Sequence, residues 1–351
     1  MLSMLTCLSH RSIITLRRPE NENLGGLHRH NRNPIVELRL VSRPYQTGVE
    51  LRTMNRALGI LYIVISAASF GTLAIFGRYA YADGLDTFTL LFLRFTFSAL
   101  IMAGILIVRR EGLPRGKPLA LLIGMGAIGY VGQSFCYLTA TQYASAGLVA
   151  LLLYLYPIFV AILSVIFLKE KLNRVKVIAL ALATTGVALI VDPQGGQWLG
   201  IALAIGAAAI YSVYIIVGAG VMKKVSAISS STVIFASAGL VYGVLMAING
   251  PHWPITADGW LTVAATVLIA TVIAVVTFLA GLKRIGPTDA SMLSTLEPVV
   301  TVLLAAWLFD ETLQPVTWLG GALILIAVIV LTRSELRQTE RDSSLAAARS
   351  E

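Results

Sequence analysis

Long runs of apolar residues, separated by short polar breaks, occupy the chain from Leu58 onward. A helix needs about 20 apolar residues to cross roughly 30 Å of hydrocarbon. Ten runs approach that length, at residues 58–77, 87–108, 118–138, 144–168, 175–191, 198–218, 230–249, 259–281, 287–309 and 316–332. Polar and apolar residues do not alternate within them, which argues against barrel strands. The predicted fold class is therefore all-α, a polytopic membrane protein with ten transmembrane helices.

The apolar runs repeat at one constant offset. Pro157 in the fourth run and Pro298 in the ninth are 141 residues apart, and Glu170 and Glu311 are separated by the same number. Further identical residues share this offset without a gap, namely Leu172 and Leu313, Val175 and Val316, Gly77 and Gly218, and the Leu-Gly-Ile triplets at 58–60 and 199–201. The chain is therefore predicted to be an internal duplication. Each copy holds an odd number of spans, so the second copy must lie inverted relative to the first.

This duplication divides the chain into four parts. Residues 54–192 are predicted to form the first repeat, residues 193–333 the second, and residues 334–351 a cytoplasmic tail. Residues 1–53 lack a sustained apolar period, carry eight Arg against four Glu, and are expected to be a disordered basic tail. Three interpretations of that tail stay open: an over-long start with the true initiator at Met54, a cleaved transit peptide, or a membrane-surface arm.

Charged residues lie mainly between the apolar runs, and their sign depends on the side of the membrane. If Arg56 is cytoplasmic, the breaks on its side hold nearly all the Lys and Arg of the membrane part. The opposite breaks hold the acidic residues Asp83, Asp86, Asp192, Asp258, Asp310 and Glu311. This asymmetry follows the positive-inside rule. It predicts an integral protein of the cell (inner or plasma) membrane with both termini in the cytoplasm.

Composition excludes several classes of protein. Hydrophobic residues make up 57% of the chain and charged residues 13%, against about 25% charged residues in soluble domains. The net charge of +9 comes without a basic stripe containing aromatic residues, so no nucleic-acid partner is expected. The two cysteines, Cys7 and Cys136, lie far apart, and His252 is the one histidine outside the tail. No metal site, no cofactor and no catalytic residue are therefore predicted, and the chain is not expected to be an enzyme.

Two ionisable residues stand out deep within the apolar runs, Arg94 and Glu297. A charge at the centre of a spanning helix costs about 2.5–3.5 kcal/mol, so such residues usually face the protein interior or a water-filled cavity. One hypothesis is a static ion pair that locks two helices together. The functional hypothesis is that Arg94 attracts an anionic group of a solute, while Glu297 takes up and releases a proton.

Pro157 and Pro298 each remove a helix hydrogen bond at matching depths, which predicts a helix break or a simple packing kink. In membrane proteins built from inverted repeats, matched breaks mark a binding site between the repeats. Polar side chains at similar depth complete the candidate solute site, namely Gln133, Tyr137, Tyr156, Tyr211 and Tyr214. Their polar neighbours at this depth are Tyr154, Ser294 and Thr295. Tyr156 and Glu297 occupy equivalent positions in the two repeats, as expected for a site that binds an asymmetric solute. For each tyrosine, ordinary helix packing remains the alternative.

A set of short motifs resembles a known family. The first repeat holds Ala144-Ser145-Ala146, Leu155-x-Pro157 and Leu168-x-Glu170-x-Leu172. The second holds Leu296-x-Pro298, Phe309-x-Glu311-x-Leu313 and Gly320-Gly321-Ala322, and the second span contains Leu93-Arg94-Phe95. Over residues 55–333 the chain resembles the EamA domain of the drug/metabolite transporter superfamily. The resemblance implies ten helices in two inverted five-helix repeats and solute movement by alternating access, often export of amino acids or related metabolites.

These observations together predict a secondary transporter that exports a small metabolite, an amino acid or related solute, with a proton as coupling ion. The alternatives are an integral membrane structural or assembly protein, or a membrane enzyme without transport activity. The expected partners are the lipid bilayer and a small-molecule solute. The sequence leaves the substrate, the direction, the coupling ion and the oligomeric state open, a homodimer included.

Overall fold

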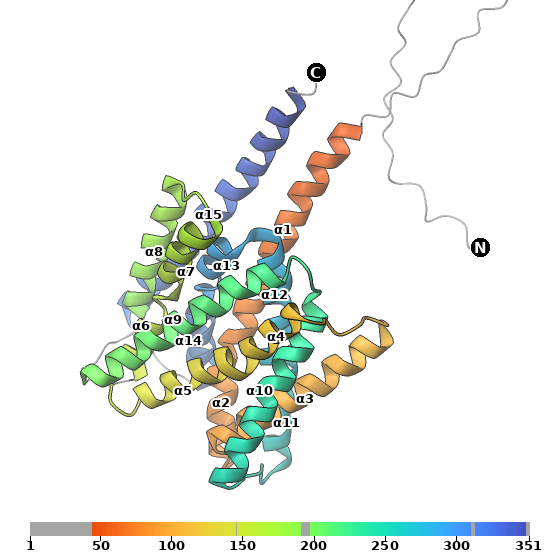
Figure 1. Ribbon diagram of the computed structural model, residues 1–351. Helices are drawn as coiled ribbons and strands as arrows, with labels where there is room; N and C mark the ends of the chain where they lie inside the picture. Colours follow the sequence, from red (N-terminus) through yellow and green to blue (C-terminus); the bar gives the residue numbers. More distant parts are fainter. Residues whose placement is uncertain (1–43, 145, 191–196, 310–312, 349–351) are drawn as a thin grey trace, which may run out of the picture.

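The computed structural model describes residues 44–144, 146–190, 197–309 and 313–348, and within them the regular elements are helices (Figure 1). The first half consists of α1 (Pro44–Gly71), α2 (Leu73–Ala82), α3 (Thr87–Val108), α4 (Lys117–Gly124), the π-helical turn η1 (Met125–Tyr130), α5 (Val131–Ala140), α6 (Ala146–Leu153), α7 (Tyr156–Leu168) and α8 (Arg174–Ile190). The second consists of α9 (Trp198–Val221), α10 (Ala227–Asn249), α11 (Ala257–Val267), the π-helical turn η2 (Leu268–Ile273), α12 (Ala274–Ile285), α13 (Pro287–Leu293), α14 (Leu296–Phe309) and α15 (Pro315–Ala348).

Nine helical segments of the described chain are long and apolar enough to cross a membrane. They correspond to nine of the ten predicted spans, and the remaining span is α8, a 17-residue helix that packs along α15. The all-α membrane fold is confirmed. The large apolar side chains on the outside of the bundle, such as Ile107, Leu240 and Phe167, are 76%, 72% and 68% exposed and form a surface suited to lipid.

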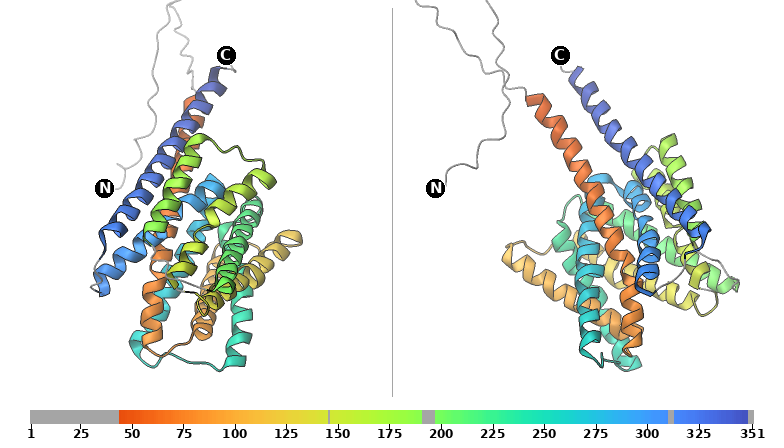
Figure 2. Two further views of the ribbon diagram at one scale, coloured as in Figure 1. Left: turned by 90° about the vertical axis from the view of Figure 1, so that its left-hand side faces the viewer. Right: turned by 180° about the vertical axis from the view of Figure 1, so that it is seen from behind.

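Helices extend into both segments that the sequence analysis predicts as tails. Residues 44–53, assigned to the tail by the sequence analysis, form the start of α1, and residues 334–348 continue α15. The rest of both tails lies outside the described residues. Figure 2 shows α1 and α15 extending past the other helices at one end of the bundle, so the first turns of α1 and the last turns of α15 project from the same end. We call this the terminal end.

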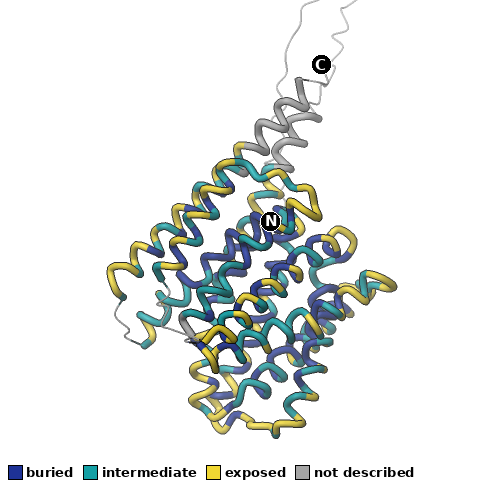
Figure 3. The backbone as a smooth tube through the Cα atoms, turned by 60° about the vertical axis from the view of Figure 1, so that its left-hand side comes forward, coloured by how far each residue is buried: buried dark blue, intermediate teal, exposed yellow. Residues whose placement is uncertain are grey.

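The two halves interlock, and their packing is symmetric under exchange of one half for the other. Helix α1 packs against α12, and its counterpart α9 packs against α5 in the same way. The contact of α7 with α9 is likewise matched by that of α14 with α1. Two further pairs, α3 with α10 and α8 with α15, join equivalent elements of the two halves, and α7 of the first half also contacts α13 of the second. The buried core is therefore shared between the repeats, as Figure 3 shows by the buried residues along the inner faces of the helices.

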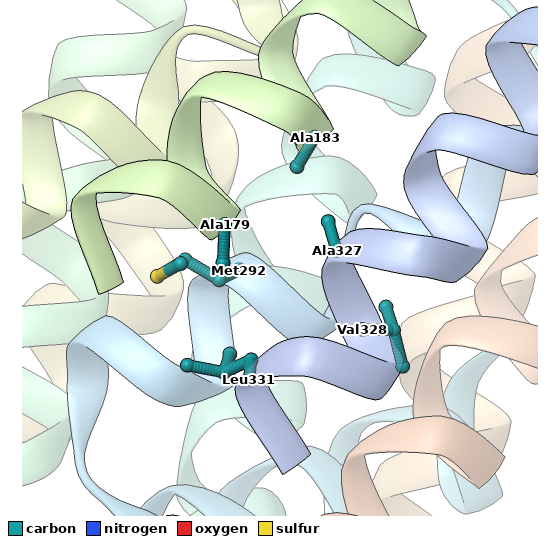
Figure 4. Close-up of a pocket in the computed structure, with 6 residues that line it drawn as sticks. All are labelled: Ala179, Ala183, Met292, Ala327, Val328 and Leu331. Carbon is teal, nitrogen blue, oxygen red and sulfur yellow. The ribbon is translucent and has the colours of Figure 1, made fainter. Parts of the chain in front are cut away.

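Helices α8 and α15 approach closely because glycines face each other where they cross. A Cβ atom at Gly186 would lie 2.6 Å from the carbonyl oxygen of Gly320, and one at Gly320 would lie 2.5 Å from that of Gly186. Nearby, α8, α13 and α15 leave a small gap between their side chains that has no room for a water molecule (Figure 4). Its lining is apolar throughout, namely Ala179, Ala183, Met292, Ala327, Val328 and Leu331. This gap has neither the room nor the polar groups that a solute site needs.

Helix interruptions occur at equivalent places in the two halves. Helix α6 ends at Leu153 and α7 begins at Tyr156, just before Pro157. Helix α13 ends at Leu293 and α14 begins at Leu296, just before Pro298. A proline has no N–H to continue the helix ladder, so both breaks fall where the sequence removes a hydrogen bond. The π-helical turns η1 and η2 interrupt the third and eighth spans in a similarly matched way.

Candidate functional site

Glu297 lies in the first turn of α14, directly after the break that separates this helix from α13. The backbone N–H of Glu297 donates to the carbonyl of Ser294 at 3.0 Å, which closes the break with a tight turn. The end of α1 meets the same point, because Thr301 Oγ1 donates both to Gly71 O at 2.9 Å and to Glu297 O at 3.1 Å. Leu296 and Pro298 are buried, whereas the side chain of Glu297 is half-buried. The carboxyl group therefore lies within the bundle, next to the break between α13 and α14.

Tyrosines from three spans surround this carboxyl group. The Glu297 carboxylate interacts electrostatically with the hydroxyl groups of five residues, Tyr130, Tyr137, Tyr154, Tyr156 and Tyr211. Tyr156 is buried, and its hydroxyl donates to the Ser291 carbonyl of α13 at 3.3 Å. The other four tyrosines are half-buried. Ring faces, hydroxyl groups and one carboxyl group thus line the point where the two helix breaks meet.

The aromatic rings form a continuous series from this site toward the second span. Tyr156 meets Tyr211 edge to face at 4.8 Å, and Tyr211 stacks on Tyr214 at 5.9 Å. Tyr214 then meets Tyr130 at 5.6 Å, and Tyr130 meets Phe95 at 5.0 Å. Each such pair contributes about 0.5–1.5 kcal/mol beyond the burial of its area. The series connects the Glu297 end of the site with the residue next to Arg94.

Arg94 is buried, with 4% of its surface exposed, and binds the π-helical turn of the eighth span. Its Nε donates to Thr271 Oγ1 at 2.7 Å and its Nη2 to the Ala270 carbonyl at 3.2 Å. A π-turn leaves backbone carbonyls without their usual helical partner, so η2 provides an acceptor for the guanidinium group. Arg94 also interacts electrostatically with Glu297, although no ion pair within 4.0 Å joins them among the described residues. The direct ion-pair lock considered from the sequence is therefore not formed in this structure.

The structure brings most of the candidate residues together and leaves one aside. Glu297, Tyr137, Tyr156 and Tyr211 lie around one point, and Tyr214 joins them through ring contacts. Gln133 is half-buried on the third span and accepts from Ser134 at 3.4 Å, with no described contact to Glu297.

Sequence reasoning missed one member of the site, Tyr130. Its position three residues before Gln133 and seven before Tyr137 places it on the same helical face as both, and this spacing was available in the sequence.

The chemistry of the site follows from these groups. Among the described residues, no group of three or more His, Cys, Asp or Glu side chains could hold a metal ion. A carboxyl group, several phenol groups and a nearby guanidinium group can bind a small polar solute and exchange a proton, which suits binding better than covalent catalysis.

The fold and the site together define a class of protein. Two inverted halves share one core, their helices break at equivalent positions, and polar side chains gather at the breaks. This is the architecture of an integral membrane transporter. The chain belongs to the EamA-like transporter family, whose model matches it twice, over residues 57–192 and 198–333.

Relatives named as transporters agree with this assignment, and a solved structure shares the fold. An "Uncharacterized transporter" of Archaeoglobus fulgidus is 28% identical over 273 residues, which cover 77% of this chain and 95% of the relative. The "Uncharacterized inner membrane transporter YedA" of Escherichia coli K12 is 27% identical over 250 residues, 68% of this chain and 79% of the relative. A "Probable terminal-alkyne amino-acid exporter" of Streptantibioticus cattleyicolor is 26% identical over 258 residues, 70% of this chain and 82% of the relative. A protein crystal structure that is 23% identical covers 80% of this chain and 99% of its own with a TM-score of 0.69, which shows the shared fold.

Proposed function

We propose that this transporter exports a small metabolite, an amino acid or a related solute, by alternating access, and that Glu297 carries the coupling proton. The observation that carries the proposal is the half-buried Glu297 carboxyl at the helix break, surrounded by tyrosine hydroxyls. An ionisable group within a membrane-spanning segment is a functional candidate because its charge is costly there. The relative named as a probable amino-acid exporter supports the solute class and the direction.

The proposed cycle uses the arrangement of the two halves. Arg94 attracts an anionic group of the solute, and the ring faces of Tyr156 and Tyr211 pack against its apolar part. Glu297 loses its proton when the solute binds and regains it from the opposite side, so that a proton gradient drives net movement. The breaks beside Pro157 and Pro298 act as the hinges about which the halves change their exposure. The charge distribution supports a cytoplasmic position for both termini.

The test uses the purified protein in liposomes. A thermal-shift screen against amino acids, nucleosides, organic acids and sugars first identifies a ligand, because a solute that binds only the folded state raises its apparent stability. Uptake of that ligand is then measured in two modes, with an imposed pH gradient and by exchange against internal unlabelled ligand. We expect Glu297→Gln to lose gradient-driven accumulation while it keeps exchange, because the neutral amide loads the solute but carries no proton.

The matched control is Glu111→Gln. Glu111 lies in the loop between α3 and α4 and accepts hydrogen bonds from Ser226 and Ser229, none of which belongs to the site, so we expect its neutralisation to leave both modes unchanged. Gradient-driven accumulation by Glu297→Gln with the pH dependence of the parent protein would refute the proton role. If the parent protein exchanges no ligand of any of these classes, the proposal that it transports such metabolites is refuted.

A further inference from the structure

Four charged side chains form a cluster at the terminal end, where the two halves meet. Lys176 Nζ lies 2.8 Å from Asp289 Oδ1 and 2.9 Å from Glu170 Oε1. Arg56 Nη2 lies 3.1 Å from Asp289 Oδ2. The second oxygen of Glu170 accepts from Thr288 Oγ1 at 2.8 Å. Arg56, Glu170 and Lys176 belong to the first half, and Thr288 and Asp289 to the second, so these contacts join the halves. We call Arg56, Glu170, Lys176 and Asp289 the terminal cluster.

The contacts of the terminal cluster reach α13, and the helical backbone is interrupted at both ends of this helix. Thr288 and Asp289 lie on α13, a seven-residue helix. Before it stands Gly286, with φ of +85°, a conformation that other residues rarely adopt. After it comes the break at Ser294 and Thr295 that leads to Glu297. These two interruptions are places where α13 can pivot relative to α12 and α14. Its contacts with the first half are the ionic contacts, its buried packing on α7 and the hydrogen bond from Tyr156 to Ser291 O.

The residues that occupy the equivalent positions in the other repeat carry little charge. The repeat offset of 141 residues relates Arg56 to Gln197, Lys176 to Thr317 and Asp289 to Leu148. Glu170 corresponds to Glu311, which lies outside the described residues. At the opposite end, the connection between the halves at Asp83 uses neutral donors: Thr256 Oγ1 at 2.6 Å and the N–H of Ile255 at 2.9 Å. Among the residues that the structure describes, the positions equivalent to Arg56, Lys176 and Asp289 are therefore uncharged, so these three charges are not repeated at the opposite end.

Burial makes the terminal cluster a discrete switch. Asp289 is 2% exposed and Lys176 8%, so their charges are stable in this environment only while they are paired. Separating α13 from the first half would require water to reach both groups at once. The arrangement is therefore either fully paired and closed or hydrated and open.

We infer that the terminal cluster is an ionic lock that closes the solute pathway at the terminal end and biases the resting protein toward exposure at the opposite end. The inference rests on the proposed alternating-access cycle. Opening toward the terminal end requires α13 to leave Arg56, Glu170 and Lys176. Loss of any one of these contacts shifts the population toward the state that is open at the terminal end.

The experiment measures side-specific access to Ser294→Cys, at the break before Glu297, in a background with Cys7→Ser and Cys136→Ser. Membrane vesicles of both orientations, sorted by a tag at the C-terminus, receive a membrane-impermeant maleimide. We expect Lys176→Gln to raise the labelling rate from the terminal side at least about tenfold. The reason is that the state open at the terminal end, populated at about a few per cent in the parent protein, becomes the major state in the variant. The matched control is Lys171→Gln, an exposed lysine five residues earlier, for which we expect the rate of the parent protein.

Two further variants keep the test decisive. Arg56→Gln removes the most exposed member of the cluster, whose side chain is 28% accessible, and retains the buried Lys176 and Asp289 contact. Glu170→Gln keeps an oxygen for Thr288. Both are expected to fold and to raise labelling from the terminal side. Unchanged labelling in the folded variants, or an equal rise in Lys171→Gln, would overturn the lock. Labelling needs no solute, so an accelerated rate in a protein that shows no transport separates the lock from the proposed function.

Discussion

The close crossing of α8 and α15 predicts a large effect from one added methyl group, in Gly186→Ala. The new Cβ would lie 2.6 Å from Gly320 O, 2.7 Å from Ile324 Cγ1 and 3.1 Å from Ile324 N. Two of these atoms belong to the backbone and cannot rotate away. Because van der Waals contact needs about 3.4 Å or more, the two helices must separate by roughly 0.8 Å.

The magnitude follows from two opposing effects. Overpacking of this kind costs about 1–3 kcal/mol, whereas replacing glycine by alanine inside a helix gains up to about 1 kcal/mol. Gly104→Ala in α3 has the gain from replacing glycine in a helix but no packing cost, since a Cβ there meets nothing within 4 Å. The difference between the two variants therefore isolates the packing cost. We expect Gly186→Ala to be less stable than Gly104→Ala by about 1–3 kcal/mol.

The assay is equilibrium unfolding of the two variants and the parent protein in detergent micelles, followed by tryptophan fluorescence. Gly320→Ala serves as a second test of the same crossing, because its Cβ would lie 2.5 Å from Gly186 O. Equal stability of Gly186→Ala and Gly104→Ala would show that α8 and α15 do not cross as closely as the structure has them.

Two further outcomes follow from polar contacts between the halves. The hydrogen bond from the Thr256 hydroxyl holds the pKa of Asp83 below its usual value of 3.8, so this contact stabilises the folded protein above pH 3.8 and is lost as the pH falls through the lower folded pKa. Thr256→Val should reduce the loss of stability between pH 5 and pH 3, measured by thermal unfolding, and an unchanged acid profile would contradict it. Arg94→Gln should destabilise the fold by about 2–5 kcal/mol, because it removes charged hydrogen bonds to Thr271 and Ala270 and leaves their acceptors buried. Unfolding of Arg94→Gln at the denaturant concentration of the parent protein would argue against this contact.

Much of the fold could be predicted from the sequence, because lipid permits few backbone conformations. A run long enough to span hydrocarbon must be helical, and apolar length alone located nine spans of the described chain. The remaining predicted span corresponds to α8, a shorter helix of 17 residues that packs along α15. The start of α1 at Pro44 could not be predicted, because its first residues are mostly polar and have no apolar period to reveal a helix.

The candidate site was predictable in part. Glu297 and the breaks near Pro157 and Pro298 follow from local chemistry, since a charge or a proline in an apolar run is visible in the sequence. The partners of Arg94 were not predictable, because the acceptors at Ala270 and Thr271 exist only where the eighth span adopts a π-helical turn. Tyr130 could have been recognised by its shared helical face with Tyr137.

The sequence by itself determined the membrane class, the duplication and the inversion of the second repeat, because these depend on length, periodicity and an odd number of spans. Only the tertiary structure decided which side chains meet across the halves. Lys176 and Asp289 are 113 residues apart and lie near the ends of different spans, and no local pattern relates them. Their pairing depends on how the inverted halves pack. In the sequence Lys176 indicates only which side of the membrane its loop faces, whereas in the fold it forms a buried ion pair with Asp289.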